Sequence, residues 1–187
     1  DDETSRGLGD VYKRQGIMYV PDYYRGIKKI RLSDGACLGT LANLRYVRSL
    51  TVYENSLIAS STLGTYSYNL STGASRRCSN QRSEFRYTFA TTASNNTLYS
   101  FYNRRFYSAT LSDESGTLCP RSNFRNFVDY NTYQAYGIAA DPNQNDVIYV
   151  MDRSYNRMSK ITMNSSRSGY TLNWRKGRYR YMGVSNA

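Results

Sequence analysis

Histidine is absent from this sequence, and proline, cysteine and acidic residues are scarce. The chain has 187 residues with no His, 3 Pro and 3 Cys, and 25 Lys and Arg outnumber 14 Asp and Glu. Without histidine it lacks a common metal ligand and the usual general base of enzymes. The acidic residues are scattered, and the serine-rich turns have no neighbouring base to activate a nucleophile. The sequence therefore predicts a non-catalytic protein with no cofactor and no metal site.

Long apolar runs and helical periodicity are missing as well. No run approaches the roughly 18 apolar residues of a membrane-spanning helix, so no transmembrane segment is predicted. No segment keeps a 3.6-residue period for three turns. The chain instead contains 20 Tyr, together with Thr, Val and Ile, which favour half-buried strands. Composition therefore predicts an all-β protein, and abundant Tyr, Asn, Ser and Thr with little Lys and Glu favours an extracytoplasmic location.

The charge of the chain is strongly positive. A net charge of +11 indicates an acidic partner, such as nucleic acid, a sulfated glycan or an anionic surface. The alternative explanation is solubility combined with genomic base composition, since Arg outnumbers Lys 20 to 5. Composition leaves both explanations open.

Residues 5–15 differ in character from the rest of the chain. They read SRGLGDVYKRQ and resemble, residue for residue, the in-frame translation of a common transposase-type sequencing adapter. They lack the apolar core, about 7–15 residues long, of a signal peptide. We therefore predict that residues 1–15 are a non-native leader without regular contacts, and that the native domain, residues 16–187, is cut at both ends.

A repeat of about forty residues runs through this domain. Four short apolar segments recur at Ile17–Val20, Ser56–Ala59, Thr97–Ser100 and Val147–Val150. Each is followed by an alternating segment that ends in a turn, at Ile30–Gly35, Tyr68–Gly73, Ala109–Gly116 and Ile161–Gly169. Measured from Leu32, Leu70, Leu111 and Met163, the intervals are 38, 41 and 52 residues. The longest interval contains a polar stretch, residues 120–134, that reads as an inserted loop.

Short alternating strands bounded by Ser-Asp-Gly and Ser-Thr-Gly turns favour hairpins, and four strands per forty-residue repeat are typical of a β-propeller. We name the strands of each blade a to d, from innermost to outermost. The first blade begins at strand b, with strands near residues 17–20, 26–32 and 36–41, and further blades are predicted at residues 46–80, 86–120 and 134–175. Residues 180–187 resemble the start of another strand a.

The predicted fold is therefore an incomplete β-propeller of about four blades. Its two end faces should be apolar and favour self-association. A closed four-bladed ring would instead require Met182–Val184 to lie beside Ile17–Val20. We expect an open arc, in which these two segments lie apart.

The three cysteines are spaced at equal intervals of 41 residues, at Cys37, Cys78 and Cys119. Equal spacing suggests equivalent places in successive repeats, which would separate them by more than the roughly 7 Å Cα limit of a disulfide. An odd count also argues against a closed disulfide framework. We therefore expect three free cysteines that pack as small buried hydrophobic residues.

The last repeat resembles an NHL repeat. It reads GIAADP at residues 137–142, IYVMD at 148–152 and NRMSKI at 156–161. The first blade keeps part of the pattern in YVPD at residues 19–22 and GIKKI at 26–30, whereas the two middle blades have drifted. The resemblance implies a six-bladed ring, of which this chain is a fragment. It also implies a binding face made by the b–c and d–a loops.

Family resemblance leaves three functions open for this face. Some NHL propellers bind proteins there and some bind single-stranded RNA, while a distinct propeller branch contains lyases and hydrolases. The first is our expectation, namely a non-catalytic module that recognises a protein or an anionic surface ligand. RNA binding is the alternative, and an enzyme remains open if absent blades supply its site.

Arginine and tyrosine alternate in the b–c loops, where they can pair with anions and stack on planar groups. The candidate ligand-binding residues are Tyr23, Tyr24, Arg25, Tyr102, Arg104, Arg105, Arg153, Tyr155 and Arg157. The d–a connections add Arg45, Arg82, Arg86, Arg121, Arg125, Arg178 and Arg180. The resemblance also offers a structural interpretation, because the Asp and Arg of the repeat mostly hold a blade together. Asp22, Asp152 and Arg157 fit that role.

Overall fold

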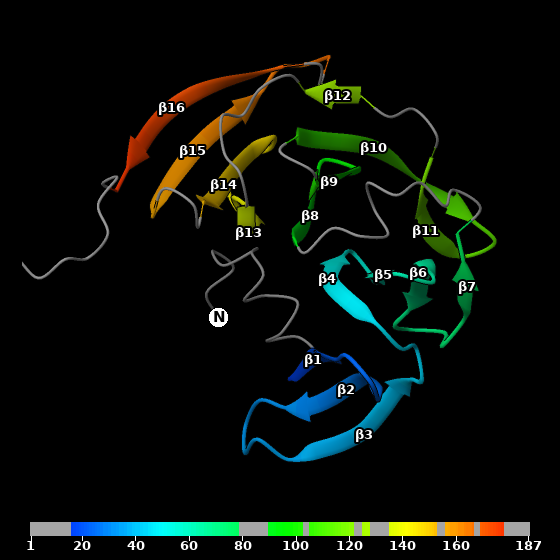
Figure 1. Ribbon diagram of the computed structural model, residues 1–187. Helices are drawn as coiled ribbons and strands as arrows, with labels where there is room; N and C mark the ends of the chain where they lie inside the picture. Colours follow the sequence, from blue (N-terminus) through cyan, green and yellow to red (C-terminus); the bar gives the residue numbers. More distant parts are fainter. Residues whose placement is uncertain are drawn as a thin grey trace, which may run out of the picture.

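The computed structural model consists of antiparallel sheets arranged as an arc (Figure 1). It describes residues 16–78, 90–102, 105–121, 125–127, 135–152, 156–166 and 169–177. All regular structure in these ranges is β-strand, so no helix there is long and apolar enough to cross a membrane. The predicted all-β fold and incomplete propeller are confirmed. The leader and Met182–Val184 lie outside the described residues, so their predictions stay untested.

The strands group into four blades in chain order. Blade 1 has three strands, β1 (Ile17–Asp22), β2 (Gly26–Arg31) and β3 (Cys37–Ala42). Blade 2 has four, β4 (Val47–Tyr53), β5 (Ser56–Ser61), β6 (Gly64–Asn69) and β7 (Ser75–Arg77). Blade 3 contains β8 (Ala90–Ser94), β9 (Thr97–Tyr102), β10 (Arg105–Glu114), β11 (Thr117–Pro120) and β12 (Arg125–Phe127). Blade 4 has β13 (Ala135–Ala140), β14 (Val147–Asp152), β15 (Arg157–Met163) and β16 (Tyr170–Lys176).

One backbone hydrogen bond recurs in every blade and fixes the repeat. The N–H groups of Leu32, Leu70, Leu111 and Met163 each donate to the carbonyl just before strand b, at 2.7–2.8 Å. These acceptors belong to Gly16, Asn55, Asn96 and Asp146. The four positions from which the repeat was measured in the sequence are therefore structurally equivalent.

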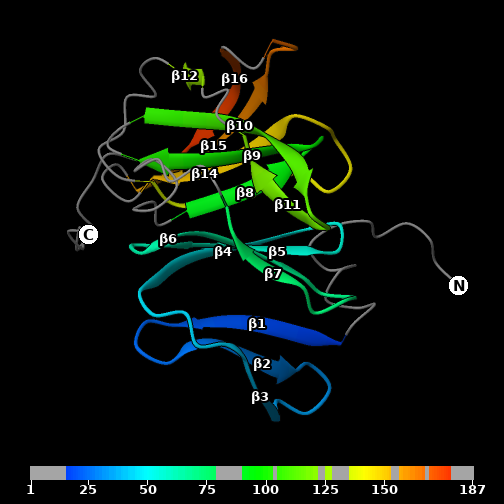
Figure 2. The same cartoon turned by 90° about the vertical axis from the view of Figure 1, so that its right-hand side faces the viewer.

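Alternation along the strands builds a separate core at each blade boundary. Blades 1 and 2 share the cluster around Tyr19, Ile27 and Leu57. Blades 2 and 3 meet around Ile58 and Leu98, and a third cluster, described below, joins blades 3 and 4. The side view shows these sheets stacked one above another (Figure 2). Each blade is thus stabilised by its neighbours rather than by a common centre.

Hydroxyl groups join the inner strands near the axis. Thr91 on β8 contacts the hydroxyls of Ser49 and Thr51 on β4, the latter at 2.6 Å. On the other side of β8, the Thr92 hydroxyl accepts a 2.9 Å hydrogen bond from the N–H of Ala140 on β13. These hydroxyl groups are buried and each has a hydrogen-bond partner. They therefore fix the inner strands of neighbouring blades relative to one another.

Blade 3 departs from the sequence prediction at its outer edge. Strand d of this blade was predicted to end near residue 120, but β12 takes that place by pairing with residues 106–108 of β10. β11 instead pairs with residues 111–114, in a hairpin that extends β10 beyond the usual end of strand c. The stretch interpreted as an inserted loop therefore supplies a strand. The sequence of residues 117–120 is that of a strand in either position, so it does not show which part of β10 these residues pair with.

The hairpin packs against blade 2 and carries a disulfide. Asn69 Nδ2 donates to the Gly116 carbonyl at 2.8 Å, and Cys78 is bonded to Cys119 with their Cα atoms 5.5 Å apart. The expectation of three unpaired, buried cysteines is wrong, because Cys119 lies in the hairpin and not at a place equivalent to Cys78. Cys37 is free and exposed, at the start of an outer strand.

Candidate functional site

The b–c loops and the first d–a connection meet at one end of blades 1 and 2. The N–H of Tyr46, in the connection from β3 to β4, donates to the Tyr23 carbonyl at 2.7 Å. The Tyr46 carbonyl accepts from the N–H of Thr62, in the b–c loop of blade 2, at 3.3 Å. The b–c loops of blades 1 and 2 and the connection between these blades therefore lie together.

A cluster of aromatic rings lies on this face. The ring centre of Tyr23 is 5.1 Å from that of Tyr24 and 5.3 Å from that of Tyr46, with both pairs in edge-to-face orientation. Tyr24 is 71% exposed, Tyr23 is 42% exposed and Leu63, from the blade 2 loop, is 45% exposed. Large exposed apolar groups gathered in one place are typical of recognition surfaces.

Basic residues adjoin these tyrosines along the chain, with Arg25 after Tyr24 and Arg45 before Tyr46. Arg25 and Arg45 are exposed, and the exposed Arg77 donates from Nη2 to the Leu63 carbonyl at 2.8 Å. We call the set of Tyr23, Tyr24, Arg25, Arg45, Tyr46 and Leu63 the Tyr–Arg patch. Guanidinium groups beside tyrosines suit a partner that offers both carboxylates and apolar surface.

Asp22 shapes the loop that presents Tyr23 and Tyr24. Its Oδ1 accepts hydrogen bonds from the N–H groups of Arg25 at 2.9 Å and Tyr24 at 3.0 Å. These bonds, led by that from Arg25, hold the pKa of the Asp22 carboxyl below its ordinary value against the opposing effect of desolvation. The turn also brings Gly26, with φ of +93°, against the Ala42 carbonyl, where a Cβ would lie only 2.1 Å from the oxygen. Asp22 therefore fixes the shape of this loop.

The other predicted site residues do not join the patch. Tyr102 is partly buried and packs on the core between blades 2 and 3. Arg157 forms a 3.1 Å ion pair with Asp152, whose side chain is fully buried. Arg105 is described only as the first residue of β10, and Arg104, Arg153 and Tyr155 lie outside the described residues. Sequence reasoning found four of the six residues of the patch but missed Tyr46 and Leu63, because neither stands in an Arg–Tyr run of a b–c loop.

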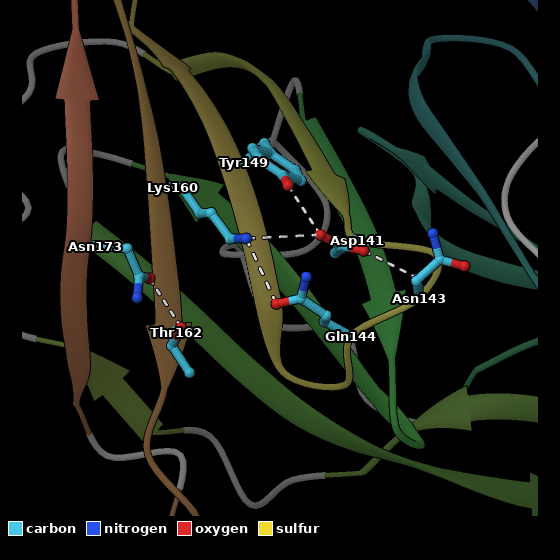
Figure 3. Close-up of polar contacts among 7 residues, drawn as sticks. All are labelled: Asp141, Asn143, Gln144, Tyr149, Lys160, Thr162 and Asn173. Carbon is cyan, nitrogen blue, oxygen red and sulfur yellow. Dashed lines mark hydrogen bonds and ion pairs between the residues drawn. The ribbon is translucent and has the colours of Figure 1, made fainter.

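The repeat signature of blade 4 forms a second polar network, on the side of the sheet opposite blade 3 (Figure 3). Asp141 Oδ2 accepts from the Tyr149 hydroxyl at 2.8 Å and lies 4.0 Å from Lys160 Nζ. Lys160 also donates to Gln144 Oε1 at 3.4 Å, and Asp141 Oδ1 accepts from the N–H of Asn143 at 2.9 Å. The network joins the a–b loop to β14 and β15, so it holds the blade together.

These contacts govern the ionisation of Asp141. Desolvation raises the pKa of its carboxyl, but the hydrogen bonds from Asn143 and Tyr149 and the charge of Lys160 prevail and leave the pKa below its ordinary value. The carboxylate is therefore fixed in its charged form near neutral pH, which suits a structural anion and not a general acid. No group of three Asp, Glu or Cys side chains in the described residues could hold a metal ion.

Comparison with known proteins supports the fold alone. No protein-family model matches the sequence, and a search of curated proteins gives no significant match. The chain is similar to solved structures titled as the nidogen/laminin complex (TM-score 0.61, 11% identity) and U3-55K (TM-score 0.55, 11% identity). It is also similar to an auxiliary nutrient binding protein from Bacteroides thetaiotaomicron (TM-score 0.62, 9% identity).

The coverage of these matches is unequal. The alignments include 87%, 87% and 90% of this chain, but 63%, 51% and 41% of the three solved chains, respectively. The chain thus spans between about two fifths and three fifths of their lengths. With the radial sheets of Figure 1, these similarities establish a partial β-propeller.

Proposed function

We propose that this chain is a non-catalytic, NHL-like β-propeller module that binds a protein partner through the Tyr–Arg patch. The observation that carries the proposal is the exposure of Tyr23, Tyr24 and Leu63 on one face, beside exposed Arg25 and Arg45. Tyrosine and arginine dominate the energetic centres of protein interfaces, because they combine apolar area with directed hydrogen bonds. The excess of positive charge favours a partner surface with Asp or Glu around an apolar centre.

The contacts of blade 4 support the NHL-like part of the proposal. Asp141, Tyr149 and Lys160 of the repeat pattern contact one another, and Asp152 pairs with Arg157. Residues that hold a blade together through such contacts are expected to recur in blades that share the repeat pattern. The residues of the repeat pattern then stabilise the blade, and we assign recognition of the partner to the loops between the blades.

Two alternatives are weighed against this function. Single-stranded RNA would use stacking on exposed rings, for which Tyr24 is available. However, Tyr23 is already in edge-to-face contact with two neighbouring rings, and Leu63 offers no stacking surface. A propeller lyase or hydrolase would draw its site from blades beyond the four described, and of the carboxylates here Asp141 and Asp152 are engaged in contacts within blade 4.

Site-specific cross-linking tests the proposed function. A photoreactive phenylalanine analogue at position 24 should form one abundant protein adduct in an extract containing the partner, identified by mass spectrometry. The same analogue at Leu172, which is 41% exposed on β16, is the matched control and should not form it. Arg25→Glu combined with Arg45→Glu should reduce the adduct at least tenfold. Equal adducts from both positions, or none at position 24, would contradict the proposal.

A further inference from the structure

The packed boundaries between blades follow one rule. Each blade turns alternate side chains toward the preceding and the following blade, which we call its preceding face and its following face. At the boundary of blades 3 and 4, the following face of blade 3 presents Tyr99, Phe101 and Phe106, which are 0%, 5% and 0% exposed. They pack on the preceding face of blade 4, formed by Ile148, Val150, Ile161 and Met163, all at most 4% exposed.

The following face of blade 4 repeats the pattern of blade 3 but is open. The pair Met151–Met158 on β14 and β15 occupies the register of Phe101–Phe106 on β9 and β10. Met151 is 58% exposed and Met158 is 42% exposed, whereas both phenylalanines are buried. Figure 3 shows Tyr149, on the same face, directed away from the strands of blade 3.

The preceding face of blade 1 is the complementary open face. Met18 pairs with Ile30 on β1 and β2 as Ile148 pairs with Ile161 on β14 and β15. Leu32 is 46% exposed, whereas its equivalent Met163 is 4% exposed. Val20 and Ile30 are also partly exposed, in contrast with the fully buried Val150 and Ile161.

We propose that two copies of this chain associate head to tail, with the following face of blade 4 in one copy packed on the preceding face of blade 1 in the other. Every interior boundary joins a following face to a preceding face, and the described residues of a single copy leave one open face of each kind. Two copies related by a twofold axis can form the contact twice, which closes the assembly. Large exposed apolar side chains at both ends supply the driving force.

The lysines of these faces do not oppose the contact. Lys160 already binds Asp141 and Gln144, and Lys28 donates to the Thr40 hydroxyl at 2.7 Å. Their aliphatic stems can therefore be covered while the amino groups keep their acceptors. The proposal is independent of the Tyr–Arg patch, because it uses neither Tyr24 nor Arg25.

Light scattering during gel filtration tests the assembly with the full chain. The expected mass is twice the 21.5 kDa of one chain. Met151→Lys with Met158→Lys should give a monomer, and so should Leu32→Lys, because each places a charge in one open face. Leu172→Lys is the control, since Leu172 is equally exposed in blade 4 but pairs with Ile161, away from the following face. A monomeric wild-type protein would overturn the proposal.

Mixing the two monomeric variants separates this arrangement from any symmetric contact. The Met151/Met158 variant keeps an intact blade 1 face, and the Leu32 variant keeps an intact blade 4 face. Their mixture should therefore recover a dimer held by one contact, which also shows that both variants are folded. If the mixture stays monomeric, the head-to-tail assignment fails. Dimerisation of either variant alone would also contradict it.

Discussion

At the scale of residues, the charged groups divide into those that hold a blade together and those that are available to a partner. Asp152 is fully buried with Arg157 at 3.1 Å, and Asp141 accepts from Tyr149 and Asn143 and lies beside Lys160 (Figure 3). Arg25 and Arg45 are exposed on the loop face. Sequence patterns are strongest for the first kind, because contacts within a blade recur with the repeat. Loop residues such as Tyr46 and Leu63 follow no such period, so their place on the loop face is visible only when the loops are placed in space.

Asp141 makes the stability of the protein depend on acid pH. Its pKa is lower in the folded chain than the ordinary value of 3.8, so its contribution is present above about pH 4 and is lost as pH falls through the folded pKa. The free energy of unfolding, measured with urea at pH 7 and near pH 3, should fall less in Asp141→Asn than in the wild type. Asp34→Asn removes an ion pair whose partners are both 49% exposed, so it should match the wild-type pH response. An unchanged response in Asp141→Asn would contradict this role.

At the scale of elements, the extension of β10 into the β11 hairpin is the main departure from a regular blade. Blades splay apart with distance from the axis, and β11 lies between the outer parts of blades 2 and 3 (Figure 1). Thr117, Cys119 and Pro120 are buried there, although the outer strands β3 and β7 are largely exposed. The hairpin thus fills space that a four-stranded blade leaves open.

The disulfide should stabilise this arrangement measurably. Closing the loop from Cys78 to Cys119, a separation of 41 residues, restricts the unfolded chain and contributes about 2–4 kcal/mol. Cys78→Ser with Cys119→Ser should lower the free energy of unfolding by that amount, measured by chemical denaturation without reductant. Cys37→Ser, at the exposed thiol, should have no effect. The native wild-type chain should have one free thiol, that of Cys37, and three free thiols would show that the bond does not form.

The strands themselves were largely predictable, and the cross-link was not. Alternation and turn residues indicated strand positions in all four blades, and Leu32 and its equivalents set the repeat correctly. The equal spacing of the cysteines was misleading, because Cys37 begins β3 whereas Cys78 follows the end of β7. Contacts such as Tyr23 with Tyr46 depend on how separate loops converge. Local sequence gives the period of the chain but not the path of an extended hairpin between blades.

At the scale of the whole molecule, the positive charge allows a test between protein and RNA as partners. The net charge of +11 produces a long-range attraction for any polyanion, and its strength falls steeply with salt. Specific protein recognition through a partly apolar patch depends less on salt. The two kinds of partner can therefore be separated without knowing the partner.

We expect only weak, salt-sensitive binding of a labelled 20-nucleotide poly(U) strand. Fluorescence anisotropy should show loss of binding between 50 and 200 mM salt, with at least equal affinity for double-stranded DNA of the same length, because the duplex carries the higher charge density. Tyr24→Ala should leave both affinities unchanged. Tight, single-strand-selective binding that Tyr24→Ala weakens more than about fivefold would favour the RNA function, because one stacked base is worth about 1–3 kcal/mol.

The position of the cross-link also determines the order in which the array of blades opens. In a monomeric variant such as Leu32→Lys, blade 1 and blade 4 each pack on a single neighbour among the described residues and can detach one at a time, whereas blades 2 and 3 must separate within a closed covalent loop. Amide protons of β5 and β9 are therefore the last to exchange with solvent, and those of β2 and β15 are the first. All four strands are paired on both sides, so the gradient reflects the coupling between blades and not the hydrogen bonds within them. The monomer therefore opens first at blades 1 and 4 and last at blades 2 and 3, which the disulfide joins.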